Sequence, residues 1–234
     1  MTDNPTTIRS GEATEPEPKG ARRQRRGERT RLKIKQALIS QLNEQDYFDL
    51  TITDICRVAQ VATGGFYFHY AKKADLLDEV IREHSAAFWT ALDAALHYLD
   101  PYSALFHAAT ALVRAYRDAS GLVRCFNQLA MADRAYVELW ETAAANWVSH
   151  LVEKLKAAEE ADQAVLSEAN AYSLLSFVDL LLFKIYIERD PGLVDCAGGV
   201  DEVIENVAVL WHRALIGCSP PEGRLTFATQ NKGV

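Results

Sequence analysis

The chain has 234 residues, 49% of them hydrophobic, which is enough to bury one sizeable core together with a small second domain. The most apolar run, residues 174–187, is too short to cross a bilayer and carries two charged residues, so we expect a cytoplasmic protein without a membrane partner. Its four cysteines are far apart in the sequence, which indicates reduced thiols and argues against a disulfide set or a metal site.

The formal net charge of −7 is unevenly distributed along the chain. Residues 22–82 contain 12 Lys or Arg against 8 Asp or Glu, whereas residues 83–234 contain 11 against 20. A positive N-terminal third on an acidic body predicts that a polyanion such as DNA approaches from one side only.

The N-terminus begins with a polar, proline-containing segment, residues 1–21, for which we expect a disordered tail. Residues 21–35 then contain eight basic residues and one acidic residue. One interpretation is a solvated charge run. We favour an arm that follows the phosphate backbone or a minor groove. Its candidate DNA contacts are Arg22, Arg23, Arg25 and Arg26.

Three helices are predicted after the arm. The first runs from about residue 28 to 45 and buries Leu32, Ala37 and Leu38. Thr51 precedes an apolar run and is followed three residues later by Asp54, a spacing typical of a capping box at the start of a helix. A short connection leads to a further helix from about Thr63. Two short helices so closely joined cross steeply, which is the geometry of a helix-turn-helix.

The segment from Thr51 to Leu77 resembles the DNA-binding domain of the TetR family of transcriptional regulators. The matching residues are Thr51, Ile52, Ile55, Ala59, Val61, Gly64, Phe66, Tyr67, His69, Tyr70 and Lys73. The resemblance implies a three-helix DNA-binding unit. The DNA contacts that it implies are Thr51, Thr63, Gly64, Gly65, Tyr67, His69 and Lys73.

Three residues depart from the family pattern. Gln60 replaces the turn glycine, so a left-handed backbone conformation that costs glycine little is expected at a residue with a side chain. Ala62 replaces the usual capping serine, and we expect helix capping to shift to Thr63. Gly65 replaces the usual threonine, which leaves base contacts dependent on Thr63 and on close backbone approach.

The remainder of the chain reads as entirely helical. A connecting helix runs from Lys73 until Asp100 and Pro101 stop it. Further helices are expected at 102–118, 121–132, 134–160, 164–189 and 200–216, and a flexible tail at 218–234. The predicted fold is therefore all-α, with an N-terminal helix-turn-helix domain (22–72) joined by a long helix to a helical ligand-binding and dimerisation domain (73–217).

A ligand site is predicted from aromatic residues in the second domain. Trp140 and Trp147 lie two turns apart with alanines between them, which leaves room for an elongated apolar ligand, although plain core is an equal alternative. A weaker resemblance to the EthR-type subgroup implies an apolar tunnel here. The candidate ligand contacts are Phe106, Trp140, Ala144, Trp147, His150, Val178, Asp179, Phe183 and Trp211. An acyl-CoA, a steroid-like molecule or a drug-like compound would suit such a wall.

The sequence contains no Gly-rich phosphate loop, paired metal ligands or nucleophile–base cluster, so we expect neither an enzyme nor a cofactor. The family resemblance implies a homodimeric repressor that binds double-stranded operator DNA and releases it when an apolar effector binds. Helices 164–189 and 200–216 carry apolar residues over more than one face, as a four-helix dimer interface requires. Two alternatives stay open: a DNA-binding regulator without an effector, including an activator, and a helical lipid carrier whose basic arm binds an acidic membrane.

Overall fold

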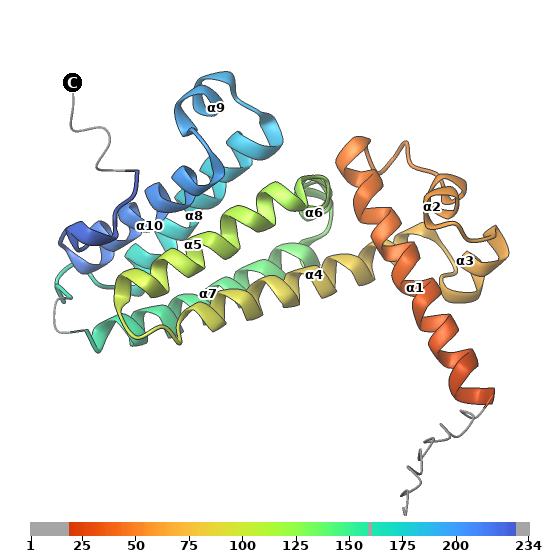
Figure 1. Ribbon diagram of the computed structural model, residues 1–234, viewed down its shortest axis with the longest axis horizontal. Helices are drawn as coiled ribbons and strands as arrows, with labels where there is room; N and C mark the ends of the chain where they lie inside the picture. Colours follow the sequence, from red (N-terminus) through yellow and green to blue (C-terminus); the bar gives the residue numbers. More distant parts are fainter. Residues whose placement is uncertain (1–18, 159–160, 228–234) are drawn as a thin grey trace, which may run out of the picture.

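The computed structural model describes residues 19–158 and 161–227, and the regular elements in these ranges are helices (Figure 1). A small N-terminal domain contains α1 (Lys19–Glu44), α2 (Ile52–Ala59) and α3 (Thr63–His69). From it α4 (Lys73–Ala95) runs along a larger helical body (Figure 1). The body is built from α5 (Pro101–Asp118), α6 (Ser120–Ala132), α7 (Arg134–Lys156), α8 (Glu168–Phe183) and α10 (Val200–Ile216). The predicted all-α fold is confirmed.

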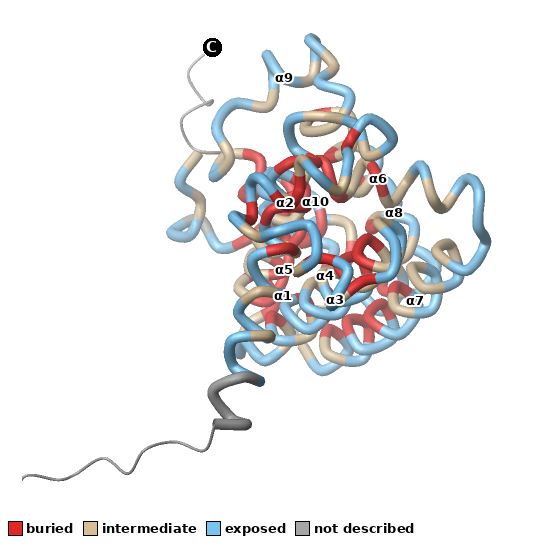
Figure 2. Tube along the Cα trace, turned by 90° about the vertical axis from the view of Figure 1, so that its right-hand side faces the viewer, coloured by how far each residue is buried: buried red, intermediate tan, exposed pale blue. Residues whose placement is uncertain are grey.

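Buried residues gather where helices face one another and form two apolar cores (Figure 2). The smaller core lies under α1–α3 and the first half of α4, with Leu38, Ile55 and Phe66 fully buried. Leu122 and Cys125 of α6 belong to it as well. The larger core fills the body. The small domain is therefore packed against the body through both α4 and α6.

Helix starts follow from capping residues. Asp100 accepts a hydrogen bond from the Ser103 amide at 2.9 Å, with Pro101 in the first turn of α5. Asp190 and Pro191, which lie between the predicted helices 164–189 and 200–216, cap an additional short helix in the same way, α9 (Pro191–Ala197). The residues that interrupt the preceding helix here therefore also start the next one.

Both ends of the chain differ from expectation. Helix α1 begins at Lys19 rather than near residue 28, so residues 19–21 of the predicted tail are helical, while residues 1–18 lie outside the described part. Leu32, expected in the core, is 55% exposed. At the other end, residues 218–227 fold back: buried Glu205 accepts hydrogen bonds from the amides of Thr226 and Phe227, both at 2.8 Å. The predicted flexible tail is wrong for residues 218–227.

The apolar segment that ends with α8 is longer than the sequence suggested. Helix α8 continues into a π-helix, η1 (Lys184–Glu188), and Glu168–Glu188 gives 21 mainly apolar helical residues. By length and composition alone such a helix can cross a membrane. Only 28% of it is buried, and Phe177 and Leu180 are 68% and 54% exposed. Its exposed apolar face needs a partner.

The end of α1 is bonded directly to the start of α6. The Asn43 side-chain oxygen accepts the Gly121 amide at 2.9 Å, and Arg124 donates to the Leu42 carbonyl at 2.9 Å. Gly121 permits this approach because a Cβ there would lie 1.9 Å from the Leu42 carbonyl oxygen.

We predict that Gly121→Ala separates α1 from α6 and lowers the free energy of unfolding by roughly 1–3 kcal/mol, because its methyl group would overlap the Leu42 backbone. Urea denaturation measures this effect. Gly223→Ala is the matched control, since a Cβ there meets nothing within 4 Å. Equal stability of the two variants would contradict the close packing.

Candidate DNA-binding surface and ligand cavity

The predicted capping box at the start of α2 is present. The Thr51 hydroxyl accepts the Asp54 amide at 3.2 Å, and the Asp54 carboxylate accepts the Thr51 amide at 3.2 Å. These bonds satisfy amides that the first helical turn leaves unpaired. Thr51 therefore fixes the start of α2, and the residue remains exposed to solvent.

The turn between α2 and α3 depends on Gln60, whose φ of 56° and ψ of 45° lie in the left-handed region. The expectation of a left-handed residue at this position is confirmed. Capping of α3 differs from expectation: Ala62 occupies the cap position without a side-chain bond, and Thr63 is already the first helical residue. Thr63 cannot cap the helix because its own backbone belongs to it.

Helix α3 presents one face inward and another to solvent. Phe66 and Tyr70 are buried, whereas Tyr67 is 55% exposed. Phe68 is 74% exposed, and a Cβ added at Gly64 or Gly65 would meet no atom within 4 Å. The outer face of α3 is therefore open to a partner that approaches its backbone closely.

Two predicted DNA contacts have neighbours within the protein. His69 is half-buried beside α1, where a Cβ on Gly27 would lie 3.7 Å from its ring. The Lys73 ammonium donates to the carbonyls of Tyr47 and Leu50, at 2.7 and 2.5 Å. Burial lowers the pKa of Lys73. Lys73 thus ties the α1–α2 connection to α4 rather than facing the candidate DNA surface. Neighbouring Lys72, with a side chain 71% exposed, faces solvent instead.

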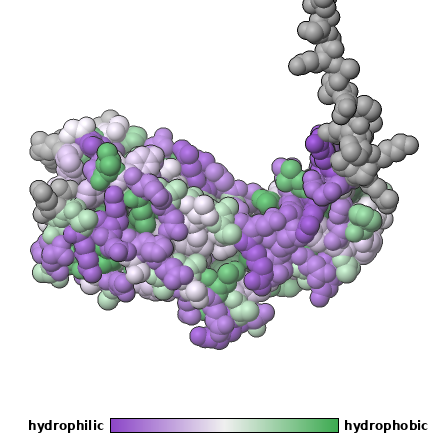
Figure 3. Space-filling view, turned by 90° about the horizontal axis from the view of Figure 1, so that it is seen from below, coloured by the Kyte–Doolittle hydropathy of each residue, from purple (hydrophilic) through white to green (hydrophobic). Residues whose placement is uncertain are grey.

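The basic segment is part of α1 rather than an extended arm. Helical spacing of three and four residues brings Arg26, Arg29 and Lys33 together, and all three line a groove beside Ala62 and Gly65. Sequence reasoning missed Arg29 and Lys33, which it placed in the predicted helix 28–45 but did not count among the DNA contacts. Arg25 and Arg26 are exposed, while the side chains of Arg22 and Arg23 lie outside the described part. On the face seen in Figure 3, this domain is mainly hydrophilic with separate apolar spots.

Residues 34–80 match the family described as bacterial regulatory proteins, tetR family. Residues 34–80 therefore form a TetR-family domain. Over 63 residues it is 41% identical to the "Uncharacterized HTH-type transcriptional regulator YxbF" of Bacillus subtilis (strain 168), a match that covers 26% of this chain. The chain spans only 17% of that relative's length.

Solved structures share the TetR-like fold over most of the chain. A transcriptional regulator from Rhodococcus sp. Rha1 has a TM-score of 0.62 at 17% identity, over 81% of this chain and 99% of that one. A TetR-like regulator from the same organism has a TM-score of 0.57 at 16% identity, over 85% and 97%. At these identities the likeness concerns the fold alone.

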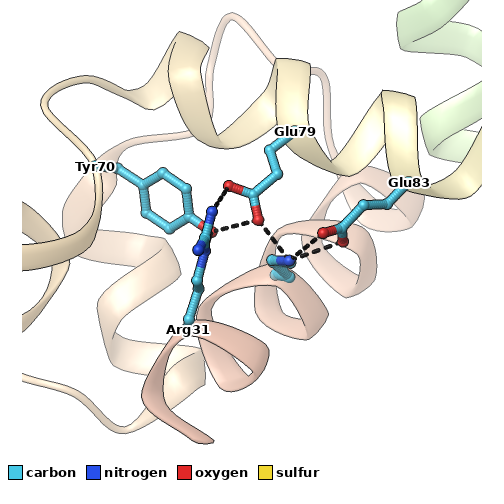
Figure 4. Close-up of polar contacts among 5 residues, drawn as sticks. Arg31, Tyr70, Glu79 and Glu83 are labelled. Atoms are coloured by element: carbon cyan, nitrogen blue, oxygen red, sulfur yellow. Dashed lines mark hydrogen bonds and ion pairs between the residues drawn. The ribbon is translucent and has the colours of Figure 1, made fainter. Parts of the chain in front are cut away.

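A polar network fastens the TetR-family domain to α4 (Figure 4). Arg31 of α1 pairs with Glu79 of α4 and donates to the Tyr70 hydroxyl at 3.2 Å. Lys35 lies 2.5 Å from Glu79 and 2.6 Å from Glu83. Burial alone would raise the pKa of Glu79, but hydrogen bonds from Arg31 and Lys35 hold it below its usual value. The network fixes the angle between α1 and α4.

A cavity of about 290 Å³ lies in the body, close to this junction. Its lining comes from α4, α5, α6, α7 and α8. The lining residues are Ile81, His84, Ser85, Phe88, Ala115, Tyr116, Leu122, Val123, Phe126, Asn127, Ala130, Val137, Trp140, Glu141, Tyr172 and Asp179. Of the predicted ligand contacts, Trp140 and Asp179 line it.

The other predicted ligand contacts do not line this cavity. Ala144, Trp147, Val178 and Trp211 are buried in the main core, where the Trp147 and Trp211 rings lie 5.9 Å apart. Half-buried Phe106 and Phe183 pack against the same core. His150 is exposed and lies 3.4 Å from Asp93. Ala144 of α7 thus packs in the core rather than against a ligand, and this part of the predicted tunnel wall is core.

The lining of the cavity includes a polar pair. The Tyr116 hydroxyl donates a hydrogen bond to the Asp179 carboxylate across α5 and α8. Burial raises the pKa of Asp179 and outweighs the opposing effect of this bond. Burial also raises the pKa of Tyr116 and lowers that of His84. The site can offer a carboxylate, a hydroxyl and a neutral imidazole beside aromatic rings.

We predict that Asp179→Asn stabilises the free protein at about pH 7 by on the order of 1 kcal/mol, or roughly 2–4 °C in Tm. The raised pKa of Asp179 means that its favourable contribution is complete below the unfolded-state value and is lost as pH rises through the folded-state value. The amide avoids this loss, and its oxygen can still accept from Tyr116.

Thermal unfolding of the two proteins at about pH 7 and about pH 4 checks this prediction, because the gain should shrink in acid. Glu168→Gln, which neutralises an exposed carboxylate of the same helix, should bring no gain. Lower stability of Asp179→Asn at neutral pH would show that the charge is well compensated.

Proposed function

We propose that the chain is a homodimeric transcriptional repressor of the TetR family, acting in the cytoplasm, that binds operator DNA and releases it when a small effector enters the cavity. The observation that carries this proposal is that α4 and α6 both line the cavity and both belong to the core of the helix-turn-helix domain. The alternative of a regulator without an effector does not account for a cavity at that junction.

DNA binding is supported by the outer face of α3 and the groove beside it. Thr63, Gly64, Gly65, Tyr67 and Phe68 lie on a short helix of the size that enters a major groove. Arg26, Arg29 and Lys33, together with exposed Lys72, would hold the flanking phosphates. Base reading would depend on Thr63, on the approach to the glycines and on apolar contact from Phe68.

Dimerisation is supported by the apolar face that α8 and α10 leave uncovered. Phe177 and Leu180 of α8 and Leu210 of α10 are between 44% and 68% exposed. Pairing of these helices with their copies would cover that surface and present two recognition helices to successive major grooves, about 34–36 Å apart. It also accounts for the low burial of Glu168–Glu188 without a membrane.

Effector response is supported by the way the two connecting helices are used. Ile81 of α4 and Leu122 of α6 touch both the cavity and the core of the DNA-binding domain. A ligand that separates these helices would favour a different angle of the small domain, and the two recognition helices would no longer match the groove spacing. Operator release would follow from that shift in population.

We predict that Gly65→Ala weakens binding to operator duplexes selected from a random pool by about tenfold or more, because the methyl group occupies the space through which α3 approaches DNA. The same change should leave the free protein as stable as before or up to about 1 kcal/mol more stable. Gly223→Ala should leave DNA binding unchanged. Undiminished binding by Gly65→Ala would exclude close approach at this residue.

We also predict that replacing Arg26, Arg29 and Lys33 together by glutamine lowers the salt dependence of binding to a mixed-sequence duplex. The slope of log K against log salt should fall by roughly one for each phosphate that the variant no longer binds. Replacing three exposed basic residues of the body, Arg114, Arg117 and Lys156, gives a control of equal charge. Equal slopes for the two triple variants would remove the α1 groove from the DNA surface.

A further inference from the structure

The charged side chains that line the cavity are all acidic. Two carboxylates line it, that of half-buried Asp179 and that of exposed Glu141, and its lining contains no lysine or arginine. The one imidazole, His84, is held neutral at physiological pH because burial lowers its pKa. Arg134 lies 3.9 Å from Glu141 but outside the lining, and its side chain is 75% exposed.

Aromatic rings form the apolar wall beside these carboxylates. Phe88 and Trp140 stack with their centroids 5.8 Å apart, and Phe126 lies 6.2 Å from Trp140. The faces of such rings are electron-rich and attract organic cations, most strongly when water is excluded. The wall and the carboxylates therefore favour the same sign of ligand charge.

Asp179 retains capacity to bind a donor. Among the described residues its carboxylate has one hydrogen bond, from the Tyr116 hydroxyl, and no cationic partner. A carboxylate inside an apolar helix is costly unless a positive group or further donors compensate it. No lysine or arginine of the lining supplies a positive group for it.

We propose that the effector of the proposed repressor is a small aromatic organic cation, such as a protonated amine on a one- or two-ring body. Its ammonium group would bind Asp179, beside the Tyr116 hydroxyl, and its rings would lie against the Phe88–Trp140 pair. The inference rests on the proposed function only in naming the cation as an effector of DNA binding; the choice of ligand class does not depend on it. It excludes an acyl-CoA, because phosphate groups need basic partners that this lining does not offer.

The volume fits this ligand class. About 290 Å³ lies just below the range for small-molecule sites, roughly 300–1,000 Å³, and suits one or two fused rings better than a steroid or a long acyl chain.

The test is calorimetric titration of the full-length protein with three probes of equal shape: naphthylethylammonium, propylnaphthalene and naphthylpropanoate. We expect the cation to bind at least about tenfold more tightly than the neutral probe, and the anion to bind most weakly. Asp179→Asn should abolish the preference for the cation over the neutral probe. Glu168→Gln, an equal loss of charge on the exposed part of α8, should preserve it.

Equal binding of the cation and the neutral probe, absence of binding by all three, or a preference that survives in Asp179→Asn would each overturn the inference. DNA binding measured in the same samples separates it from the proposed function. Cation binding without any change in DNA affinity would contradict effector control while leaving the ligand class intact. Normal DNA binding with no cation binding would contradict the ligand class while leaving the proposed DNA-binding function intact.

Discussion

The angle between α1 and α4 is the constraint on which the rest of the molecule depends. The two helices are fastened on one side by Glu79, which binds both Arg31 and Lys35. On another side the end of α1 is fastened to α6 by the bonds of Asn43 and Arg124, with Gly121 allowing backbone contact. The small domain is attached to the body through α4 and α6, so it cannot turn unless both helices move. Its orientation therefore depends on the separation of α4 and α6.

The position of the cavity gives this constraint a functional meaning. Packed interiors hold few voids, and a cavity lined by an ionisable carboxylate costs stability that a plain core would not. Here the void separates the two helices that hold the DNA-binding domain, with Ile81 and Leu122 on its wall and in the adjacent core. A ligand that fills this cavity contacts the junction directly, so its effect does not depend on a longer chain of residue contacts through the protein.

Local signals in the sequence predicted local structure well. The Thr51–Asp54 capping box and the left-handed Gln60 each follow from a few neighbouring residues. The cavity could not be found in this way, because it depends on how five helices pack. Alanines beside Trp147 leave room for a ligand or for a neighbouring helix, and tertiary packing chose the helix. Lys73 matched a family position, yet two carbonyls from a distant connection hold its ammonium.

Helix α8 joins the two events that the proposed repressor must couple. Asp179 projects from it to the cavity, while its neighbours Phe177 and Leu180 lie exposed on the face assigned to the partner. A helix that is packed against a partner cannot retreat from a ligand, so the displacement that binding requires must fall on the side of the cavity that is not held in the dimer. That side includes α4 and α6. A rigid α8 would therefore direct the effect of binding toward the helix-turn-helix domain, and a weaker dimer would be a less responsive one.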